Sequence, residues 1–186
     1  RKCKSVRSLV YITSDKCYEN VEWLWGYREN DRIGGYDPYS SSKAAAELIF
    51  SSYLRSFFCD RPNLGAASVR AGNVIGGGDW AEDRIIPDCV RAIESGKPIH
   101  LRNPFATRPW QHVLEPLSGY LLLAAHLRKE PSTYGGSWNF GPSSKEVRTV
   151  LEVAEHLVAR FGRGSISSET SADKHHEAKL LQLNCD

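Results

Sequence analysis

The sequence has no methionine, few cysteines, almost no net charge and no long apolar run. Its five cysteines are scattered, and no two of them form a Cys-x-x-Cys pair (Cys3, Cys17, Cys59, Cys89 and Cys185). This spacing argues against a disulfide scaffold and against a zinc knuckle, so we expect no metal site of that kind. Free thiols are typical of a reducing compartment, and we therefore expect a cytoplasmic protein.

The charges nearly cancel, with 24 Lys and Arg against 22 Asp and Glu, which leaves a formal net charge of +2. So small an excess does not indicate a nucleic-acid partner or a membrane surface. The longest apolar run, residues 120–125, is too short to cross a bilayer, and the basic start of the chain lacks the pattern of a secretory signal. Because the chain has no initiator methionine, we expect it to be a piece of a longer protein.

What the sequence does contain is an alternation of short apolar runs and helical patterns. We expect strands at 8–13, 64–71, 99–101 and 138–141, and helices at 38–57, 84–94, 117–127 and 147–161. A polar, aromatic loop separates the first strand from the first helix, where Asp37 and Pro38 are typical of an N-cap and a first helical residue. This alternation predicts an α/β fold with a parallel sheet.

The spacing of Tyr39 and Lys43 on the first predicted helix points to chemistry. Residues four apart share one helix face, so the phenol and the ammonium group can reach a common site. A nearby cation favours the phenolate, which suits the pair to proton abstraction. The competing interpretation is an ordinary exposed Tyr and Lys, because so short a motif also arises by chance.

Polar residues follow two of the predicted strands, at the sheet edge where α/β proteins place functional groups. After the strand at 8–13, the run Ser14-Asp15-Lys16 offers a hydroxyl, a carboxylate and an amine. The alternative is a plain solvated turn. After the strand at 64–71, residues 70–80 (RAGNVIGGGDW) contain glycines that would let backbone amides approach a phosphate, although a glycine run is usually only a loop.

Together these motifs resemble the extended short-chain dehydrogenase/reductase family. The family likeness rests on Tyr39-x-x-x-Lys43 preceded by a strand that ends in Ser14-Asp15-Lys16. Within the family, four runs resemble the CDP-glucose 4,6-dehydratases: 13–18 (TSDKCY), 72–80 (GNVIGGGDW), 108–113 (RPWQHV) and 175–180 (HHEAKL). These runs extend, in order, over nearly the whole chain.

The resemblance implies a partial Rossmann-like parallel sheet, its C-terminal half, plus a smaller mixed α/β domain that binds the sugar nucleotide. Residues 1–75 would belong to the NAD-binding domain, and 76–186 to the sugar-nucleotide region, interleaved with the last Rossmann elements. It also implies NAD as cofactor, CDP-glucose as substrate and a homodimer. The implied reaction oxidises C4 of the sugar, removes water across C5 and C6, and returns hydride to C6.

The resemblance also implies roles for the catalytic residues. Tyr39 would take the proton of the C4 hydroxyl, and Lys43 would support it and contact the nicotinamide ribose. Ser14 would orient the C4 oxygen, and Asp15 would protonate the departing C6 hydroxyl. Lys16 stands where related dTDP-glucose dehydratases carry a glutamate, so it would be the base for the C5 proton or have a purely electrostatic role.

For ligand binding, the resemblance implies contacts from five further positions. The backbone of Ala71 and Gly72 would lie beside the nicotinamide, and Asn73 and Arg108 would meet the diphosphate, since a guanidinium can bond two phosphate oxygens at once. Arg84 is a weaker candidate for the same phosphate.

The remaining candidates are aromatic. His176 would approach the nucleotide, and a zinc site at His175 and His176 is disfavoured for want of a third ligand at helpful spacing. Trp23, Trp25 and Trp80 would line the sugar or base pocket, or serve the core.

One family feature is missing from the sequence. The glycine-rich fingerprint G-x-x-G-x-x-G that follows the family's first strand is absent, and Gly76-Gly77-Gly78 lies in the wrong place to replace it. We therefore expect a partial dehydratase without the portion that holds the ADP end of NAD, with exposed sheet edges. Two alternatives stay open: a nucleotide-sugar 4-epimerase of the same superfamily, disfavoured by Asp15-Lys16, and a non-catalytic fragment that binds nucleotide sugars.

Overall fold

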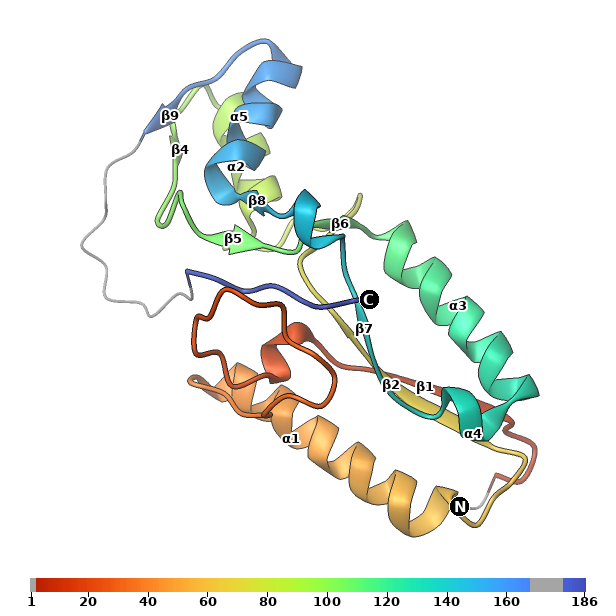
Figure 1. Cartoon of the computed structure of the whole chain (residues 1–186). Coiled ribbons are helices and arrows are strands. Elements are labelled where there is room, and N and C mark those ends of the chain that lie inside the picture. The colour runs from red at the N-terminus through yellow and green to blue at the C-terminus, as the bar shows by residue number, and fades with distance from the viewer. Residues whose placement is uncertain (1–2, 168–178) are drawn as a thin grey trace.

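A computed structural model describes residues 3–167 and 179–186 and places a parallel sheet at the centre of the chain (Figure 1). The sheet has the strand order β1-β2-β7. Its strands are β1 (Ser8–Ile12), β2 (Gly65–Ala71) and β7 (Gly136–Phe140). Both neighbouring pairs are parallel. The predicted α/β fold with a parallel sheet is therefore confirmed.

Alternate residues of the strands face opposite sides of the sheet, as a period of two requires. On one side lies α1 (Pro38–Tyr53), where Phe50 stacks on Tyr11 of β1 with ring centroids 5.4 Å apart. On the other side lies α3 (Leu114–Lys129), whose Leu123 and Leu127 pack with Ala67 and Val69 of β2. Figure 1 shows the two helices on opposite sides of the strands.

Helix α1 begins as its sequence predicts. The Asp37 carboxylate accepts a hydrogen bond from the backbone N–H of Ser40 at 3.0 Å, and Pro38 is the first helical residue. A short π-helical turn, Leu54–Phe58, continues it to the predicted end. Helix α3 starts at residue 114, earlier than the predicted 117. A short helix, α4 (Pro131–Tyr134), then leads into β7.

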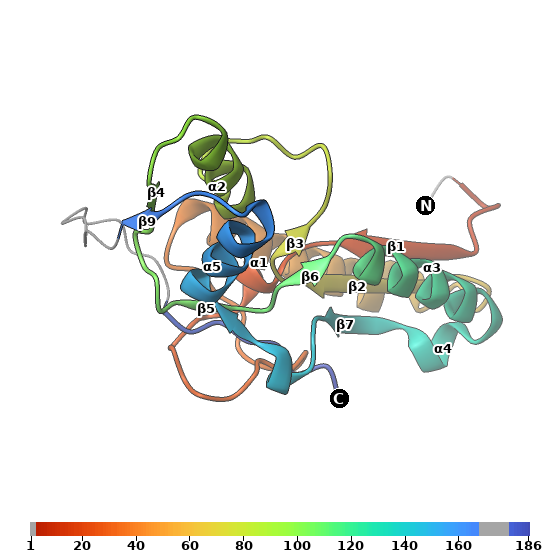
Figure 2. The ribbon, with the colours of Figure 1, turned by 90° about the horizontal axis from the view of Figure 1, so that it is seen from above.

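A second group of elements packs around α2 (Ile85–Glu94) and α5 (Val150–Phe161), seen at one end in Figure 2. Its core contains seven buried residues: Cys89, Ile93, Ile99, Leu101, Ala106, Val150 and Ala154. Two pairs of short strands frame it, β4 (Ile99–His100) with β9 (Ile166–Ser167), and β5 (Thr107–Arg108) with β8 (Arg148–Thr149).

The predicted start of the helix at 147–161 was wrong by three residues. Residues 148–149 form β8, and α5 begins only at Val150. The cause is a capping box, in which the Thr149 hydroxyl accepts from the backbone N–H of Glu152 and the Glu152 carboxylate accepts from the backbone N–H of Thr149.

Two further short strands join motifs that are distant in sequence. β3 (Val74–Ile75) pairs in parallel with β6 (Gln111–His112), so the run 72–80 lies beside the run 108–113. The last residues of the chain return to the loop before α1, where Leu181 and Leu183 share a core with Cys17, Tyr18 and Tyr27. The first turn of that loop is the 3₁₀ turn η1 (Asp15–Cys17), and a second such turn, η3 (Ser144–Glu146), precedes β8.

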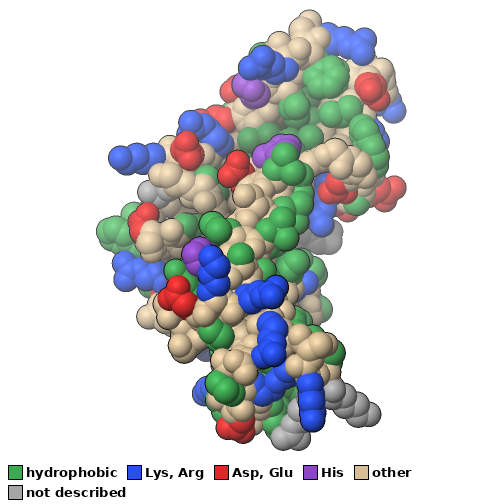
Figure 3. Space-filling view, turned by 90° about the vertical axis from the view of Figure 1, so that its right-hand side faces the viewer, with side chains coloured by type: hydrophobic (Ala, Val, Ile, Leu, Met, Phe, Trp, Pro, Cys, Tyr) green, Lys and Arg blue, Asp and Glu red, His purple; other side chains and the backbone are tan. Residues whose placement is uncertain are grey.

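Apolar side chains are also found on the surface. One face of the molecule shows them interspersed with Lys and Arg (Figure 3). Four leucines of α3 are between 45% and 75% exposed: Leu114, Leu117, Leu121 and Leu122. In the part of the chain that the structure describes, no helix is long and apolar enough to cross a membrane. The predicted domain boundary between residues 75 and 76 stays a prediction.

Candidate active site

The turn that follows β1 holds the first group of predicted site residues. Ser14 is the N-cap of η1, and its hydroxyl accepts from the backbone N–H of Lys16 at 3.2 Å. The same hydroxyl donates to Oδ1 of Asp15 at 3.0 Å. The solvated turn that competed with a functional interpretation is excluded for Asp15, which is only 4% exposed.

The Asp15 carboxyl has an unusual environment. Its second oxygen, Oδ2, is buried and has no hydrogen-bond partner among the described residues. Burial raises the pKa of Asp15 to about 6, against the opposing effects of the Lys16 charge, the Ser14 hydrogen bond and the Arg108 charge. A carboxyl with a pKa in this range holds its proton for a useful fraction of the time near neutrality, which suits it to act as a general acid.

Helix α1 brings the second group of predicted residues to the same region. The Nζ atom of Lys43 lies 5.5 Å from the ring centroid of Tyr39, so the two side chains share a face as predicted. The Tyr39 side chain is 55% exposed, which leaves it open to a ligand. Helix α1 packs against η1. The hydrogen bonds from Ser40 lower the pKa of Asp37, with a smaller effect of the Lys16 charge.

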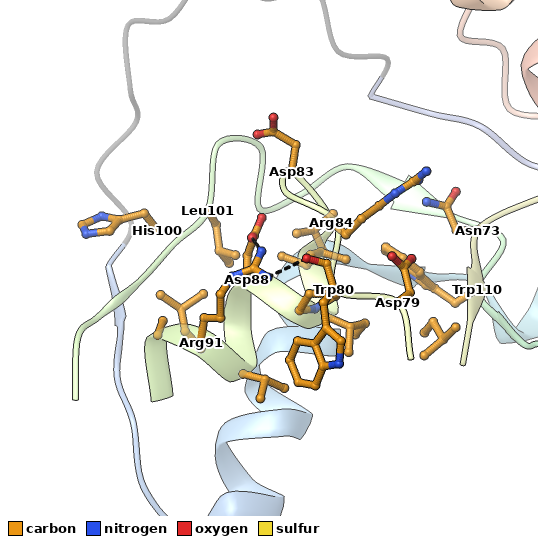
Figure 4. A pocket seen from close by; sticks show the side chains of 18 of the residues that line it. Asn73, Asp79, Trp80, Asp83, Arg84, Asp88, Arg91, His100, Leu101 and Trp110 are labelled. Atoms are coloured by element: carbon orange, nitrogen blue, oxygen red, sulfur yellow. Dashed lines mark hydrogen bonds and ion pairs between the residues drawn. The ribbon is translucent and has the colours of Figure 1, made fainter. Parts of the chain in front are cut away.

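A cleft of about 860 Å³ brings together three of the predicted substrate-binding residues, Asn73, Arg84 and Arg108. Asn73 follows β2, Arg84 precedes α2, and Arg108 belongs to β5 and is 4% exposed. Figure 4 shows the Arg84 side chain extending toward Asn73. Two guanidinium groups beside an amide form a donor-rich wall, which is suited to a diphosphate.

Arg108 links this cleft to the turn η1. It lines the cleft, and its charge acts on the Asp15 carboxyl, whose pKa is raised chiefly by burial. One of its guanidinium nitrogens donates to the carbonyl of Thr107 at 2.8 Å. The two groups of predicted residues therefore meet at this arginine.

Aromatic rings also line the cleft. Trp80 and Trp110 are both part of its wall (Figure 4). The loop that carries Trp80 is held by Arg91, which donates to the carbonyls of Trp80 at 3.0 Å and Ala81 at 3.3 Å. Trp110 was not among the predicted site residues, although its place in the run 108–113 was a signal that could have found it.

The other two tryptophans that were predicted for the pocket do not line this cleft. Trp23 packs on Tyr27 with ring centroids 5.4 Å apart, and Trp25 is 74% exposed. His176 and His175 lie outside the described residues. Among the residues that the structure describes, no three His, Cys, Asp or Glu side chains are grouped as a metal site requires.

The loop after β2 needs a glycine at position 72. A Cβ atom at this position would lie 2.2 Å from Cγ of Pro109, so only glycine allows the run 72–80 to approach the run 108–113 this closely. Ala71 and Gly72 thus form a narrow backbone ledge at the end of β2. At Gly77, by contrast, an added Cβ would meet no atom within 4 Å.

Comparisons with known proteins identify a matching family and several relatives of this chain. The model of the NAD dependent epimerase/dehydratase family matches residues 1–141. A CDP-glucose 4,6-dehydratase from Salmonella typhimurium is 49% identical over 97% of this chain, and the chain spans 52% of that protein's length. A trifunctional UDP-glucose 4,6-dehydratase from Arabidopsis thaliana is 25% identical over 88% of this chain, which spans 23% of that protein.

Solved structures show the same fold. A dTDP-glucose 4,6-dehydratase from Bacillus anthracis, in complex with NAD, superposes with a TM-score of 0.78 at 23% identity, covering 96% of this chain and 53% of that one. A UDP-glucuronic acid 4-epimerase from Bacillus cereus superposes with a TM-score of 0.77 at 17% identity, covering 95% of this chain and 52% of that one. Because the sequence identities are this low, these superpositions show a shared fold and nothing more.

Proposed function

The chain belongs to the NAD-dependent epimerase/dehydratase family, and from that premise we propose that it carries the catalytic residues of a 4,6-dehydratase acting on CDP-glucose. The observation that carries the proposal is the buried Asp15 carboxyl, which the Ser14 hydroxyl contacts and whose pKa burial raises to about 6. Loss of the C6 hydroxyl as water needs a proton donor, whereas a 4-epimerase expels no such group. The similarity to the Salmonella dehydratase supports the same assignment.

The residues present fit the nicotinamide end of NAD. Tyr39 and Lys43, whose side chains lie together on one face of α1, would hold the ribose, and the backbone of Ala71 and Gly72 would lie beside the ring. When bound, NAD supplies an acceptor that takes a hydride from the sugar and later returns it. Every proton transfer is left to the side chains of the chain.

We assign each proton transfer to one of these side chains. Tyr39 takes the proton of the C4 hydroxyl, with Lys43 stabilising the phenolate, and the Ser14 hydroxyl orients that oxygen. The carbonyl formed at C4 acidifies the C5 proton. As that proton leaves, the C6–O bond breaks and Asp15 gives its proton to the departing hydroxyl, which leaves as water. Lys16, partly buried beside Asp15, is the base that takes the C5 proton and returns it to C5 when hydride reaches C6. In its alternative role Lys16 stabilises the charge that develops at C5, and solvent water takes and returns the proton.

Substrate binding falls to the cleft. Asn73 and Arg108, with Arg84 at its outer edge, would hold the diphosphate, and Trp80 or Trp110 would pack against an apolar ring face of the ligand. Arg108 also acts on Asp15, so the same guanidinium connects diphosphate binding with the acid. CDP as the nucleotide rests on the similarity to the Salmonella protein.

The test is to incubate the protein with CDP-glucose and NAD and to follow the 4-keto-6-deoxy product by its absorbance in alkali. We expect product, and we expect Tyr39→Phe to abolish it. Tyr53→Phe is the matched control, because Tyr53 lies on the same helix and is 50% exposed.

The other outcomes separate the alternatives. A C4 epimer in place of the dehydrated sugar would show an epimerase. No turnover, together with a higher melting temperature in the presence of CDP-glucose, would show a non-catalytic unit that binds the nucleotide sugar.

We further propose a cytoplasmic homodimer. All five cysteines are free, which accords with a reducing compartment. The outer face of α1 exposes Leu48 at 60% and Ile49 at 59%, an apolar surface that a second copy would cover. The test compares the sedimentation of the protein with that of a double variant, Leu48→Glu with Ile49→Glu. If the dimer uses this face of α1, the double variant should sediment as a monomer.

A further inference from the structure

The helix that carries Tyr39 and Lys43 is tied to the sheet by a buried carboxylate that the sequence did not single out. Glu47 follows Lys43 by one helical turn and is 1% exposed. Its Oε2 atom lies 2.8 Å from Nη2 of Arg70 on β2, which is 2% exposed. This is the one ion pair among the described residues in which both side chains are fully buried.

Three hydroxyls also donate to Glu47, the longest of these contacts being that of Ser137 to Oε2 at 3.5 Å. The Thr13 hydroxyl donates to its Oε1 atom, and the Ser68 hydroxyl donates to Oε2 at 2.8 Å. Thr13 immediately precedes Ser14, and Ser68 lies on β2 shortly before Ala71. One carboxylate therefore binds to the ends of both strands from which the candidate active site extends.

Arg70 carries the same network to the far side of the turn η1. Its Nη1 atom donates to the Tyr18 hydroxyl at 2.8 Å, and that hydroxyl donates to Oδ1 of Asn139 on β7 at 2.7 Å. Tyr18 directly follows η1, which contains Asp15. The turn is thus held at both ends, at Thr13 by Glu47 and at Tyr18 by Arg70.

An apolar pair of similar size would pack α1 on the sheet without the cost of removing two charges from water. What an ion pair with directional hydrogen bonds adds is a fixed orientation. We propose that Glu47 is a positioning residue, which sets Tyr39 and Lys43 on α1 at the separation from Ser14 and Asp15 that proton transfer requires. The inference rests on the proposed function for its kinetic consequence, but the network itself is independent of the substrate.

The kinetic test compares Glu47→Gln with the unaltered protein, using NAD and CDP-glucose. Gln keeps the size of the side chain and removes its charge, so α1 stays folded but is less tightly held. We expect kcat to fall about 100-fold, the scale of a small displacement of catalytic groups. KM should stay within about twofold, because the cleft residues lie on other elements.

Glu152→Gln is the matched control. It removes the same charge from an exposed helix cap on α5 and lowers stability without touching α1. We expect its kcat to be unchanged. If Glu47→Gln does not fold, Ser68→Ala removes a single donor and leaves the ion pair, and we expect kcat to fall about tenfold with KM unchanged. A loss of kcat in Glu152→Gln equal to that in Glu47→Gln would overturn the proposal, because it would trace the effect to stability alone.

Amide hydrogen exchange tests the network without any turnover. We expect Glu47→Gln to speed exchange about tenfold at residues 42–47 and at 13–17, while residues 118–127 of α3 stay unchanged. Unchanged exchange in α1 would overturn the proposal even in an active enzyme. Loss of protection in a protein that does not dehydrate CDP-glucose would refute the proposed function and keep the network.

Discussion

The Ser14 hydroxyl donates a 3.0 Å hydrogen bond to one oxygen of the Asp15 carboxyl, while the other oxygen of that carboxyl is buried without a hydrogen-bond partner among the described residues. The two oxygens of the Asp15 carboxyl thus differ in their surroundings, because only one of them accepts a hydrogen bond. One is stabilised as an anion, and the other is left in surroundings that favour the protonated acid.

The first prediction concerns stability. Burial raises the pKa of Asp15 from 3.8 to about 6, a shift worth about 3 kcal/mol. Because the folded-state pKa lies above the unfolded value, the stabilisation is full below about pH 4 and is lost as the pH rises through about 6. In urea titrations at pH 4, 5, 6 and 7, we expect Asp15→Asn to gain stability relative to the unaltered protein as the pH rises. A difference that is constant across these pH values would contradict the raised pKa.

The second prediction concerns the rate of water loss. The proposed reaction needs Asp15 in its protonated form, so the dehydration rate should fall about tenfold for each pH unit above about 6. Asp15→Asn cannot donate a proton, and we expect it to lose about 100-fold or more in rate and to lose this pH dependence. Single-turnover release of water from C6 measures both. Asp60→Asn, a change at an exposed aspartate, should keep the normal profile.

The third prediction concerns Arg84. Its side chain is exposed at the edge of the cleft and extends toward Asn73 (Figure 4). Arg84→Ala should weaken binding of CDP about tenfold at low salt, with a smaller effect at high salt, because the charge of an exposed arginine is screened. Calorimetric titration at two salt concentrations measures this. Arg160→Ala, which removes an exposed charge from α5, should leave the affinity unchanged.

The fourth prediction concerns the ledge after β2. Gly72→Ala would place a Cβ atom 2.2 Å from Cγ of Pro109, and we expect it to cost about 1–3 kcal/mol in the free energy of unfolding. Gly77→Ala meets no atom within 4 Å and should be nearly neutral. Equal effects of the two substitutions in urea titrations would show that Gly72 is not held against Pro109.

Local sequence patterns predicted most of the elements because those elements follow local rules. Asp37 and Pro38 marked the start of α1, and the apolar run at 64–71 marked β2. The start of α5 was misplaced because Val147 continues the apolar helical spacing of Val150 and Leu151 backward, past the start that Thr149 and Glu152 mark. The short pairs β3–β6 and β5–β8 were not predicted, since residues that pair across long stretches of chain leave no local trace.

The same distinction holds for the site. Tyr39, Lys43 and the run 14–16 could be proposed as site residues because their spacing is local. Glu47 was missed because the sequence shows an ordinary glutamate on a helix, and only the packed fold reveals that it is buried against Arg70. Trp110 lies in the run 108–113, which the sequence did single out, but that it lines the cleft is seen only in the folded chain.

The cleft and the helix α1 come from different stretches of the chain. The cleft is lined by residues between 73 and 110 and by Val150, and the described residues of α1 do not line it. Under the proposed function, substitutions in the cleft can therefore change which nucleotide is held while Tyr39 and Lys43 keep their proposed roles. A gene duplicate of such a protein can acquire a new sugar nucleotide by altering one stretch of sequence, and its reaction by altering another.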